Sequence, residues 1–106
     1  YYNSAFGSYA LRNNTIGTNN NAFGYKVLLG NTTGSNNTAV GNFSLQSNTI
    51  GTQNTAIGFQ SLLSNTTGIN NTAVGAEACP SGDQVWNGNN APKTPKPTKV
   101  SGKKNL

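Results

Sequence analysis

The chain has 106 residues, of which 33% are hydrophobic and 8% are charged, and its formal net charge is +5. So few apolar residues exclude a large globular core, and so few charged residues are atypical of a disordered chain. The sequence has no His, one Cys, and only Glu77 and Asp83 as acids. The usual general bases, metal clusters and carboxylate pairs therefore cannot be assembled within one chain, and we expect neither enzymatic activity nor a cofactor.

A five-residue motif, Asn-(Ser/Thr/Asn)-Ala-(Phe/Val/Ile)-Gly, recurs every 17 residues from the start of the chain. Its units begin at Asn3, Asn20, Asn37, Asn54 and Asn71. Two glycines per unit argue against a helical repeat, since each costs about 1 kcal/mol relative to Ala, and the apolar residues come in short β-prone bursts. We expect an all-β fold, a parallel β-solenoid (β-roll or β-helix) with 17-residue coils over residues 1–75. An irregular Pro/Lys-rich C-terminal segment and basic tail should follow over residues 76–106.

Residues 17 apart in such a solenoid stack at about 4.8 Å, so that like side chains lie on like. This spacing predicts an internal core made of a Leu series and a Phe/Val/Ile series. The predicted core residues are Phe6, Leu11, Phe23, Leu28, Val40, Leu45, Ile57, Leu62 and Val74. The invariant motif alanines should face the other way, because side chains alternate along a strand, and would permit close approach of a second sheet or another copy of the chain. These are Ala5, Ala22, Ala39, Ala56 and Ala73.

Glycine and asparagine series mark the turns between these bursts. We expect backbone turns, with positive φ where the turn requires it, at Gly7, Gly17, Gly24, Gly34, Gly41, Gly51, Gly58, Gly68 and Gly75. Stacked amides along the axis should form an asparagine ladder at Asn14, Asn31, Asn48 and Asn65. One turn position alternates between Ile16 or Ile50 and Thr33 or Thr67, which leaves a 34-residue coil open as the less favoured alternative.

The repeat is expected to fail from Ala76. Cys79 is the single cysteine, so an intrachain disulfide is impossible, and a buried thiol is favoured over an interchain disulfide. Five of the seven basic residues fall within the last fourteen positions, where prolines favour an extended arm and no aromatic residue is interleaved. We expect this tail to contribute to assembly, and not to bind nucleic acid, through Pro92, Lys93, Pro95, Lys96, Pro97 and Lys99.

The units at Asn37–Gly41 and Asn71–Gly75 resemble two sets of fibre proteins. One is the head of trimeric autotransporter adhesins, whose short repeats form a left-handed parallel β-roll in which three chains pack side by side. The other, which is the closer match, is the Asn-Thr-Ala-Val-Gly repeat of tail and surface fibres of phages and large viruses. The resemblance covers residues 3–75. It implies a fibre, and a trimer as one form of assembly.

We therefore expect a structural subunit of an extracellular, cell-surface or virion fibre that assembles with itself, end to end, through stacked coils and the tail. An adhesive role is compatible with this expectation. The alternatives are a glycan-binding adhesin module, with aromatic residues such as Trp86 as contacts, and an ice-binding solenoid with a threonine array. That array would consist of Thr15, Thr32, Thr49 and Thr66. No apolar run is long enough to insert into a membrane, and the absence of Met indicates a fragment or a processed product.

Overall fold

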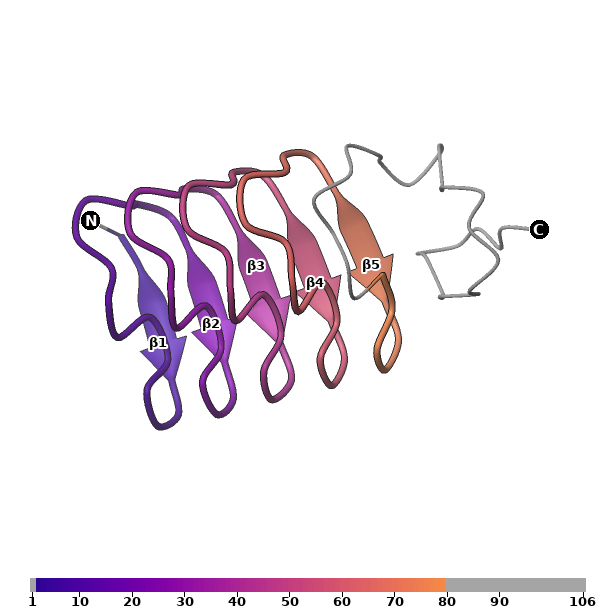
Figure 1. Cartoon of the computed structure of the whole chain (residues 1–106). Coiled ribbons are helices and arrows are strands. Elements are labelled where there is room, and N and C mark those ends of the chain that lie inside the picture. Colours follow the sequence, from indigo (N-terminus) through magenta and orange to yellow (C-terminus); the bar gives the residue numbers. More distant parts are fainter. Residues whose placement is uncertain (1, 80–106) are drawn as a thin grey trace.

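Each 17-residue unit forms one coil of a parallel β-solenoid in the computed structural model, which describes residues 2–79. The structure is all-β, with one three-residue strand in each coil. The strands are β1 (Ser4–Phe6), β2 (Asn21–Phe23), β3 (Thr38–Val40), β4 (Thr55–Ile57) and β5 (Thr72–Val74). They form a single parallel sheet in the order β1-β2-β3-β4-β5, as Figure 1 shows.

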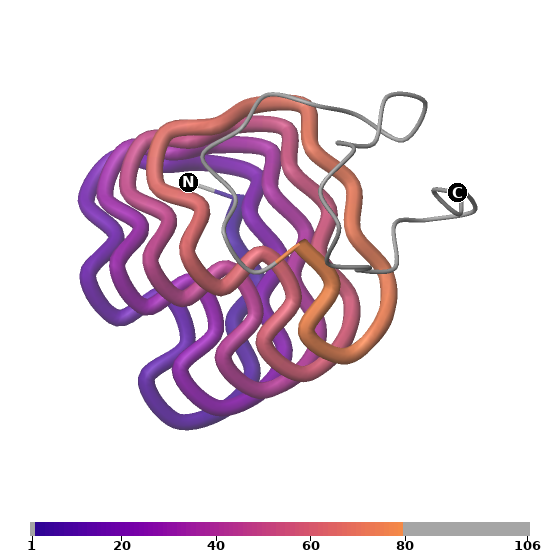
Figure 2. The backbone as a smooth tube through the Cα atoms, turned by 45° about the vertical axis from the view of Figure 1, so that its right-hand side comes forward, coloured from indigo at the N-terminus to yellow at the C-terminus, as the bar shows by residue number. Residues whose placement is uncertain are grey.

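The register of the sheet confirms the 17-residue coil. Ala22 pairs with Ala39, and Ala39 with Ala56, so that each strand residue lies beside the residue 17 positions later. Figure 2 shows the successive coils following one another with the same outline. The 34-residue alternation is therefore a pattern of surface side chains laid over a 17-residue backbone repeat.

Backbone hydrogen bonds join neighbouring coils outside the strands as well. The Leu28 amide donates to the Ser44 carbonyl at 3.1 Å, and the Leu45 amide donates to the Ser61 carbonyl at 3.0 Å. Because these bonds run along the solenoid axis, a coil obtains most of its partners from its neighbours and not from itself. Stability should therefore grow with each added coil.

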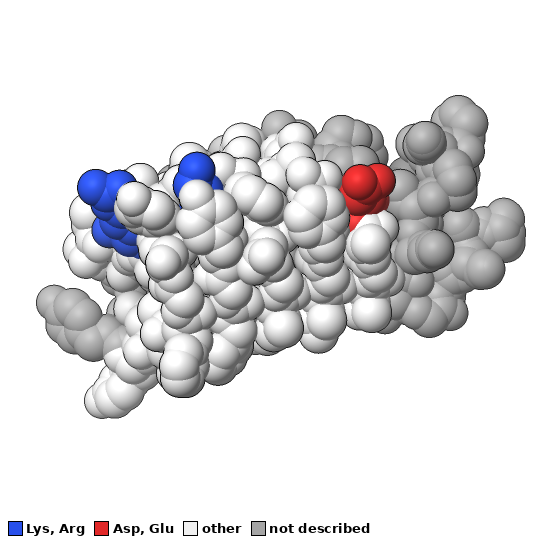
Figure 3. All heavy atoms as spheres, turned by 90° about the horizontal axis from the view of Figure 1, so that it is seen from below, with Lys and Arg blue, Asp and Glu red and all other residues white. Residues whose placement is uncertain are grey.

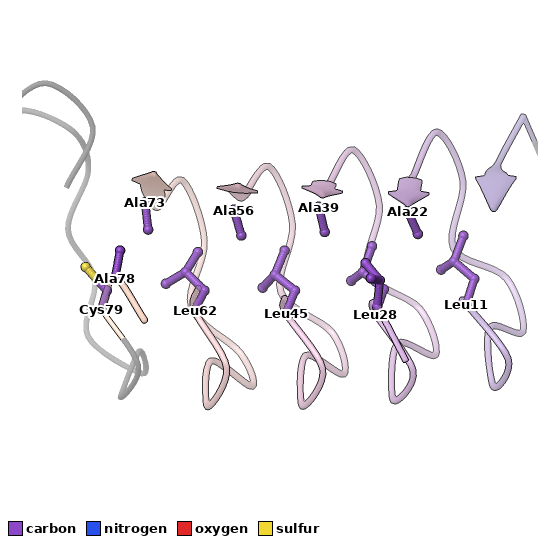
Figure 4. Close-up of a cluster of buried hydrophobic side chains, with 11 residues drawn as sticks. Leu11, Ala22, Leu28, Ala39, Leu45, Ala56, Leu62, Ala73, Ala78 and Cys79 are labelled. Atoms are coloured by element: carbon purple, nitrogen blue, oxygen red, sulfur yellow. The ribbon is translucent and has the colours of Figure 1, made fainter. Parts of the chain in front are cut away.

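The interior is a narrow space between the strands and the leucine column. Leu28, Leu45 and Leu62 are fully buried, and Leu11 in the first coil is nearly so, which confirms the predicted leucine ladder. Figure 4 shows the strand alanines pointing from the sheet toward these leucines. The fully buried strand alanines are Ala22, Ala39, Ala56 and Ala73.

The other half of the predicted core is wrong, because the Phe/Val/Ile series lies on the outside of the sheet. These side chains remain between 36% and 70% exposed. They are Phe6, Phe23, Val40, Ile57 and Val74. Side chains alternate along a strand, so only one of the two neighbouring positions can point inward. The space opposite each leucine accommodates a methyl group, and Ala takes it.

The leucine column has a second feature that the spacing did not predict. Leu28, Leu45 and Leu62 adopt left-handed backbone conformations, with φ between 50° and 52°. A non-glycine residue in this region costs roughly 1 kcal/mol or more. Complete burial of a leucine side chain offsets that cost with about 1.5–3 kcal/mol. Burial of each leucine side chain thus stabilises the left-handed turn that directs the side chain inward.

The regular coil extends beyond Gly75, where the sequence pattern was expected to fail. Cys79 occupies the position of the leucine column, with φ 50° and 4% exposure, and Ala78 is buried beside it. The Leu62 amide donates to the Ala78 carbonyl at 3.0 Å, as its equivalents do in earlier coils. Residues 76–79 therefore continue the fifth coil, and the expectation of a buried Cys79 is confirmed.

Candidate functional site: the outer face of the strands

The outer face of the five strands presents two parallel columns of side chains along the solenoid axis. The third residue of each strand forms the apolar column of exposed Phe, Val and Ile side chains described above. The first residue of each strand forms a polar column. Its members are Ser4, Asn21, Thr38, Thr55 and Thr72, and the last four are half-buried. None of the ten residues is charged, so this face can contact an uncharged surface without desolvating an ion.

Figure 3 shows the charged side chains of the described residues on a surface that is otherwise uncharged. Arg12 and Lys26 belong to the first two coils, whereas Glu77 belongs to the fifth. The described part of the solenoid is thus basic toward its first coil and acidic toward its last.

The predicted asparagine ladder is present, and the amides of Asn31, Asn48 and Asn65 each donate two hydrogen bonds within the chain. Nδ2 of Asn31 donates to Oδ1 of Asn14 at 2.9 Å, and Nδ2 of Asn65 donates to Oδ1 of Asn48 at 2.8 Å. The remaining amide hydrogen of Asn31 is donated to the Gly34 carbonyl at 3.0 Å. These residues have a structural role, as expected, because their donors are spent on the chain itself.

A second amide column, formed by the first residue of each motif, was not recognised in the sequence as a ladder. Oδ1 of Asn37 accepts from the Asn54 backbone amide at 3.0 Å, and Nδ2 of Asn37 donates to the Gly51 carbonyl at 2.9 Å. Asn20, Asn54 and Asn71 lie in the same column and are buried. Recurrence of Asn at a motif edge, with no variation in five units, was the signal for this column.

The two glycine series serve different purposes. Gly7, Gly24, Gly41, Gly58 and Gly75 have φ between 119° and 134°, which confirms the positive-φ turn there. Gly17, Gly34, Gly51 and Gly68 are not in that conformation, so the chain does not require positive φ at this series. A Cβ at Gly51 would meet Oδ1 of Asn48 and the Gly68 carbonyl. This second series is glycine because the amide columns approach its backbone closely.

Four aromatic rings form a zigzag across successive coils beside the strand ends. The ring centroids of Tyr9 and Tyr25 are 6.0 Å apart, those of Tyr25 and Phe43 are 5.5 Å apart, and those of Phe43 and Phe59 are 5.9 Å apart. All three pairs are edge-to-face, and the Arg12 guanidinium lies 5.0 Å from the Tyr9 centroid. The rings alternate between two neighbouring columns, which is one source of the 34-residue pattern.

The threonine array considered for ice binding uses its hydroxyls within the solenoid. Oγ1 of Thr15 donates to the Thr32 carbonyl at 2.9 Å, and Oγ1 of Thr32 donates to the Thr49 carbonyl at 3.2 Å. The hydroxyl of Thr49 bonds in the same way to the Thr66 carbonyl at 3.2 Å. These bonds run along the axis, so the hydroxyl hydrogens of Thr15, Thr32 and Thr49 are directed at the backbone and not at solvent.

The predicted assembly tail and Trp86 lie outside the described residues. Within residues 2–79, no group of three or more His, Cys, Asp or Glu side chains could hold a metal ion. The described part of the chain also has no helix of the length and apolarity needed to cross a membrane. Comparisons with protein-family models, curated proteins and solved structures found no match for this chain.

Proposed function

We propose that this chain is a non-catalytic structural subunit of an extracellular or virion-surface fibre that assembles with copies of itself. The observation that carries the proposal is the repetition of one set of contacts along one axis. Hydrogen bonds, amide columns and the leucine column all recur at 17-residue intervals. Such a rod adds length without adding a new kind of contact, which suits a load-bearing or spacing role.

The described side chains support this role better than a catalytic one. The polar groups buried in the coil are Asn and Ser side chains, which bond to neighbouring coils or to their own turn. The three charged residues described in the solenoid are Arg12 and Lys26, which both lie beside the Tyr9 ring, and Glu77 in the fifth coil. We further propose end-to-end contact through stacked coils and the tail over residues 91–106, and a trimer is one assembly that the family resemblance implies.

Negative-stain microscopy and sedimentation velocity of the full chain test the proposal. We expect elongated particles or filaments whose population rises with protein concentration. A chain that remains a compact monomer at the highest soluble concentration would contradict the structural role. Deleting residues 91–106 should shorten the filaments while the β-type circular dichroism of the solenoid is retained.

The second candidate function is glycan binding, and the aromatic zigzag favours it. Tyr9, Tyr25 and Phe59 retain between 38% and 46% exposure, and exposed aromatic faces can stack on sugar rings. A glycan array probed with the full chain and with a Tyr25→Ala, Phe59→Ala double variant would test this. Binding that is lost in the double variant supports the adhesin function. Equal signals from both proteins reject it.

A further inference from the structure

We propose that the outer face of β1–β5 binds the same face of a second copy of the chain, with the two solenoid axes antiparallel. The two-fold axis of this dimer passes between the two Val40 side chains, in the middle strand. The inference rests on the proposed self-assembling role and adds to it the surface, the partner and the orientation. The main observation behind it is the exposed apolar column. The sequence predicted these side chains in the core, but the fold leaves them on the surface.

The chemistry of the face selects the partner. A row of apolar side chains on an uncharged sheet is best covered by another apolar row with the same spacing between rungs. A second copy offers this spacing by construction, because both columns follow the same coil-to-coil distance of about 4.8 Å. Five rungs of three-residue strands span roughly 20 by 10 Å, which is smaller than the roughly 800 Å² per partner of a standard stable interface. We therefore expect a concentration-dependent dimer.

A two-fold axis between the two faces can run parallel to the solenoids or parallel to the strands. The apolar and polar columns of the face distinguish these two arrangements. An axis parallel to the solenoids reverses the strand direction, so it sets the apolar column of one copy against the polar column of the other. An axis parallel to the strands keeps that direction and sets apolar on apolar and polar on polar. Ile57 would then lie against Phe23, and Thr38 against Thr38. This second arrangement makes the solenoids antiparallel and leaves no apolar side chain facing a hydroxyl.

The sizes of the apolar side chains lead to the same orientation. The large residues Phe6 and Phe23 are in the first two strands, whereas Val40, Ile57 and Val74 follow. Antiparallel pairing places Phe6 against Val74 and Phe23 against Ile57, so the two ends of the interface have equal summed side-chain volume, and the smallest pair, Val40 against Val40, lies in the middle. A parallel pairing in which the sheets are shifted along the strands until the two apolar columns face each other would place Phe against Phe at one end and Val against Val at the other, which leaves a wedge. Interfaces pack densely, so the arrangement without a wedge is favoured.

The axial charge distribution agrees with this pairing. The antiparallel arrangement keeps the turns that follow the strands on the same flank in both copies. It therefore brings the fifth coil, with Glu77, level with the first coil of the partner, which carries Arg12. Parallel pairing would instead bring Glu77 level with Glu77 of the partner, and Arg12 level with Arg12 of the partner. The contribution of such exposed charges is small, and it affects orientation more than affinity.

Site-directed crosslinking of the full chain tests the orientation. Each single-cysteine variant is made in a Cys79→Ala background, and circular dichroism first verifies that the β signal is retained. Facing sheets lie about 10 Å apart, which is too far for a disulfide and suits a short bismaleimide. Mixed Phe6→Cys and Val74→Cys chains should give a crosslinked heterodimer, identified by mass. Each of the two alone should give at least several-fold less product, because equal rungs are separated by the length of the sheet.

Val40→Cys alone should crosslink efficiently, since it lies on the proposed two-fold axis. Ile57→Lys should abolish both the crosslink of the Val40→Cys chain and the dimer in sedimentation velocity. Ile50→Lys is the matched control, because Ile50 is also exposed (52%) but is not part of the sheet, and it should leave both unchanged. Dimers lost equally in both lysine variants would overturn the assignment of the face.

The other outcomes separate this inference from the proposed function. Efficient Phe6→Cys crosslinks to itself would overturn the antiparallel orientation while leaving a parallel fibre in place. A chain that forms filaments but never crosslinks through Val40→Cys would overturn the face while keeping the structural role. If the crosslink appears only after residues 80–106 are deleted, the chain's own C-terminal segment covers the face, and the proposed partner is wrong.

Discussion

The side-chain amide of Asn48 donates to Oδ1 of Asn31 at 2.8 Å, and the donor and acceptor belong to successive coils of the solenoid. The other hydrogen of the same amide is donated to the Gly51 carbonyl at 3.1 Å. Asn48 is fully buried. One buried side chain therefore makes a hydrogen bond to the neighbouring coil and another within its own turn, where water cannot replace either bond.

Asn48→Ala should lower the free energy of unfolding by about 2–4 kcal/mol, because buried Oδ1 of Asn31 loses its donor and buried Nδ2 of Asn65 loses its acceptor, at about 1–3 kcal/mol each. Asn48→Asp should destabilise at least as much, since the carboxylate has no hydrogen to donate and would be buried as a charge. Urea unfolding followed by circular dichroism measures both. Asn13→Asp, at the exposed position before the first ladder residue Asn14, is the control and should shift the midpoint little. Equal effects at the two positions would mean that the amide column does not stabilise the fold.

Ala56→Ile should destabilise the solenoid by about 1–3 kcal/mol or more, because three extra carbons must enter the fully buried space opposite the leucine column. Its neighbour gives the opposite result. Ile57→Thr changes a side chain that is 39% exposed on the other face of the same strand, and should cost the monomer less than about 1 kcal/mol. Thermal unfolding at low protein concentration compares the two. A larger loss at Ile57 would place the interior on the wrong side of the sheet.

Gly51→Ala should destabilise severely although the backbone of Gly51 is not in the positive-φ region. The added Cβ would meet the Gly68 carbonyl at 2.5 Å and the Asn54 Nδ2 at 3.0 Å, and these groups are fixed by the amide columns. Gly30→Ser is the matched control, because Ser47 and Ser64 occupy the equivalent position in later coils and the nearest atom to a Cβ is 3.2 Å away. We expect loss of the β signal near room temperature for the first variant and a nearly unchanged melting curve for the second.

Gln53→Asn should stabilise the chain by a few tenths of a kcal/mol to about 1 kcal/mol. Gln53 is exposed and has φ 59°. The equivalent positions in other coils have the same conformation and are occupied by asparagine, which tolerates positive φ better than glutamine does. They are Asn19, Asn36 and Asn70. Gln53→Val should be destabilising, since a β-branched side chain disfavours this region most. A rise of the unfolding temperature for Asn and a fall for Val would confirm the prediction. A change in the same direction for both would contradict it.

Much of the architecture follows from spacing alone. Recurrence every 17 residues with two glycines per unit excludes helices and requires coils that stack like on like, which predicts the solenoid, the buried leucines and the Asn14 to Asn65 ladder. Composition also removes most catalytic and metal chemistry from consideration. The motif alanines carried a signal that was assigned to the wrong face, because an invariant small residue marks a confined interior, whereas a position that exchanges Phe, Val and Ile tolerates changes in volume.

The tertiary structure decided what periodicity cannot specify. Alternation along a strand makes Ala56 and Ile57 face opposite ways, but it does not say which one faces inward, and that depends on how the coil closes on the leucine column. Likewise, positive φ at Leu45 and close approach at Gly51 arise from contacts with neighbouring coils, so no local propensity reveals them. A repeat determines which residues lie over one another, whereas the shape of a single coil determines which of those columns is buried and which is left on the surface.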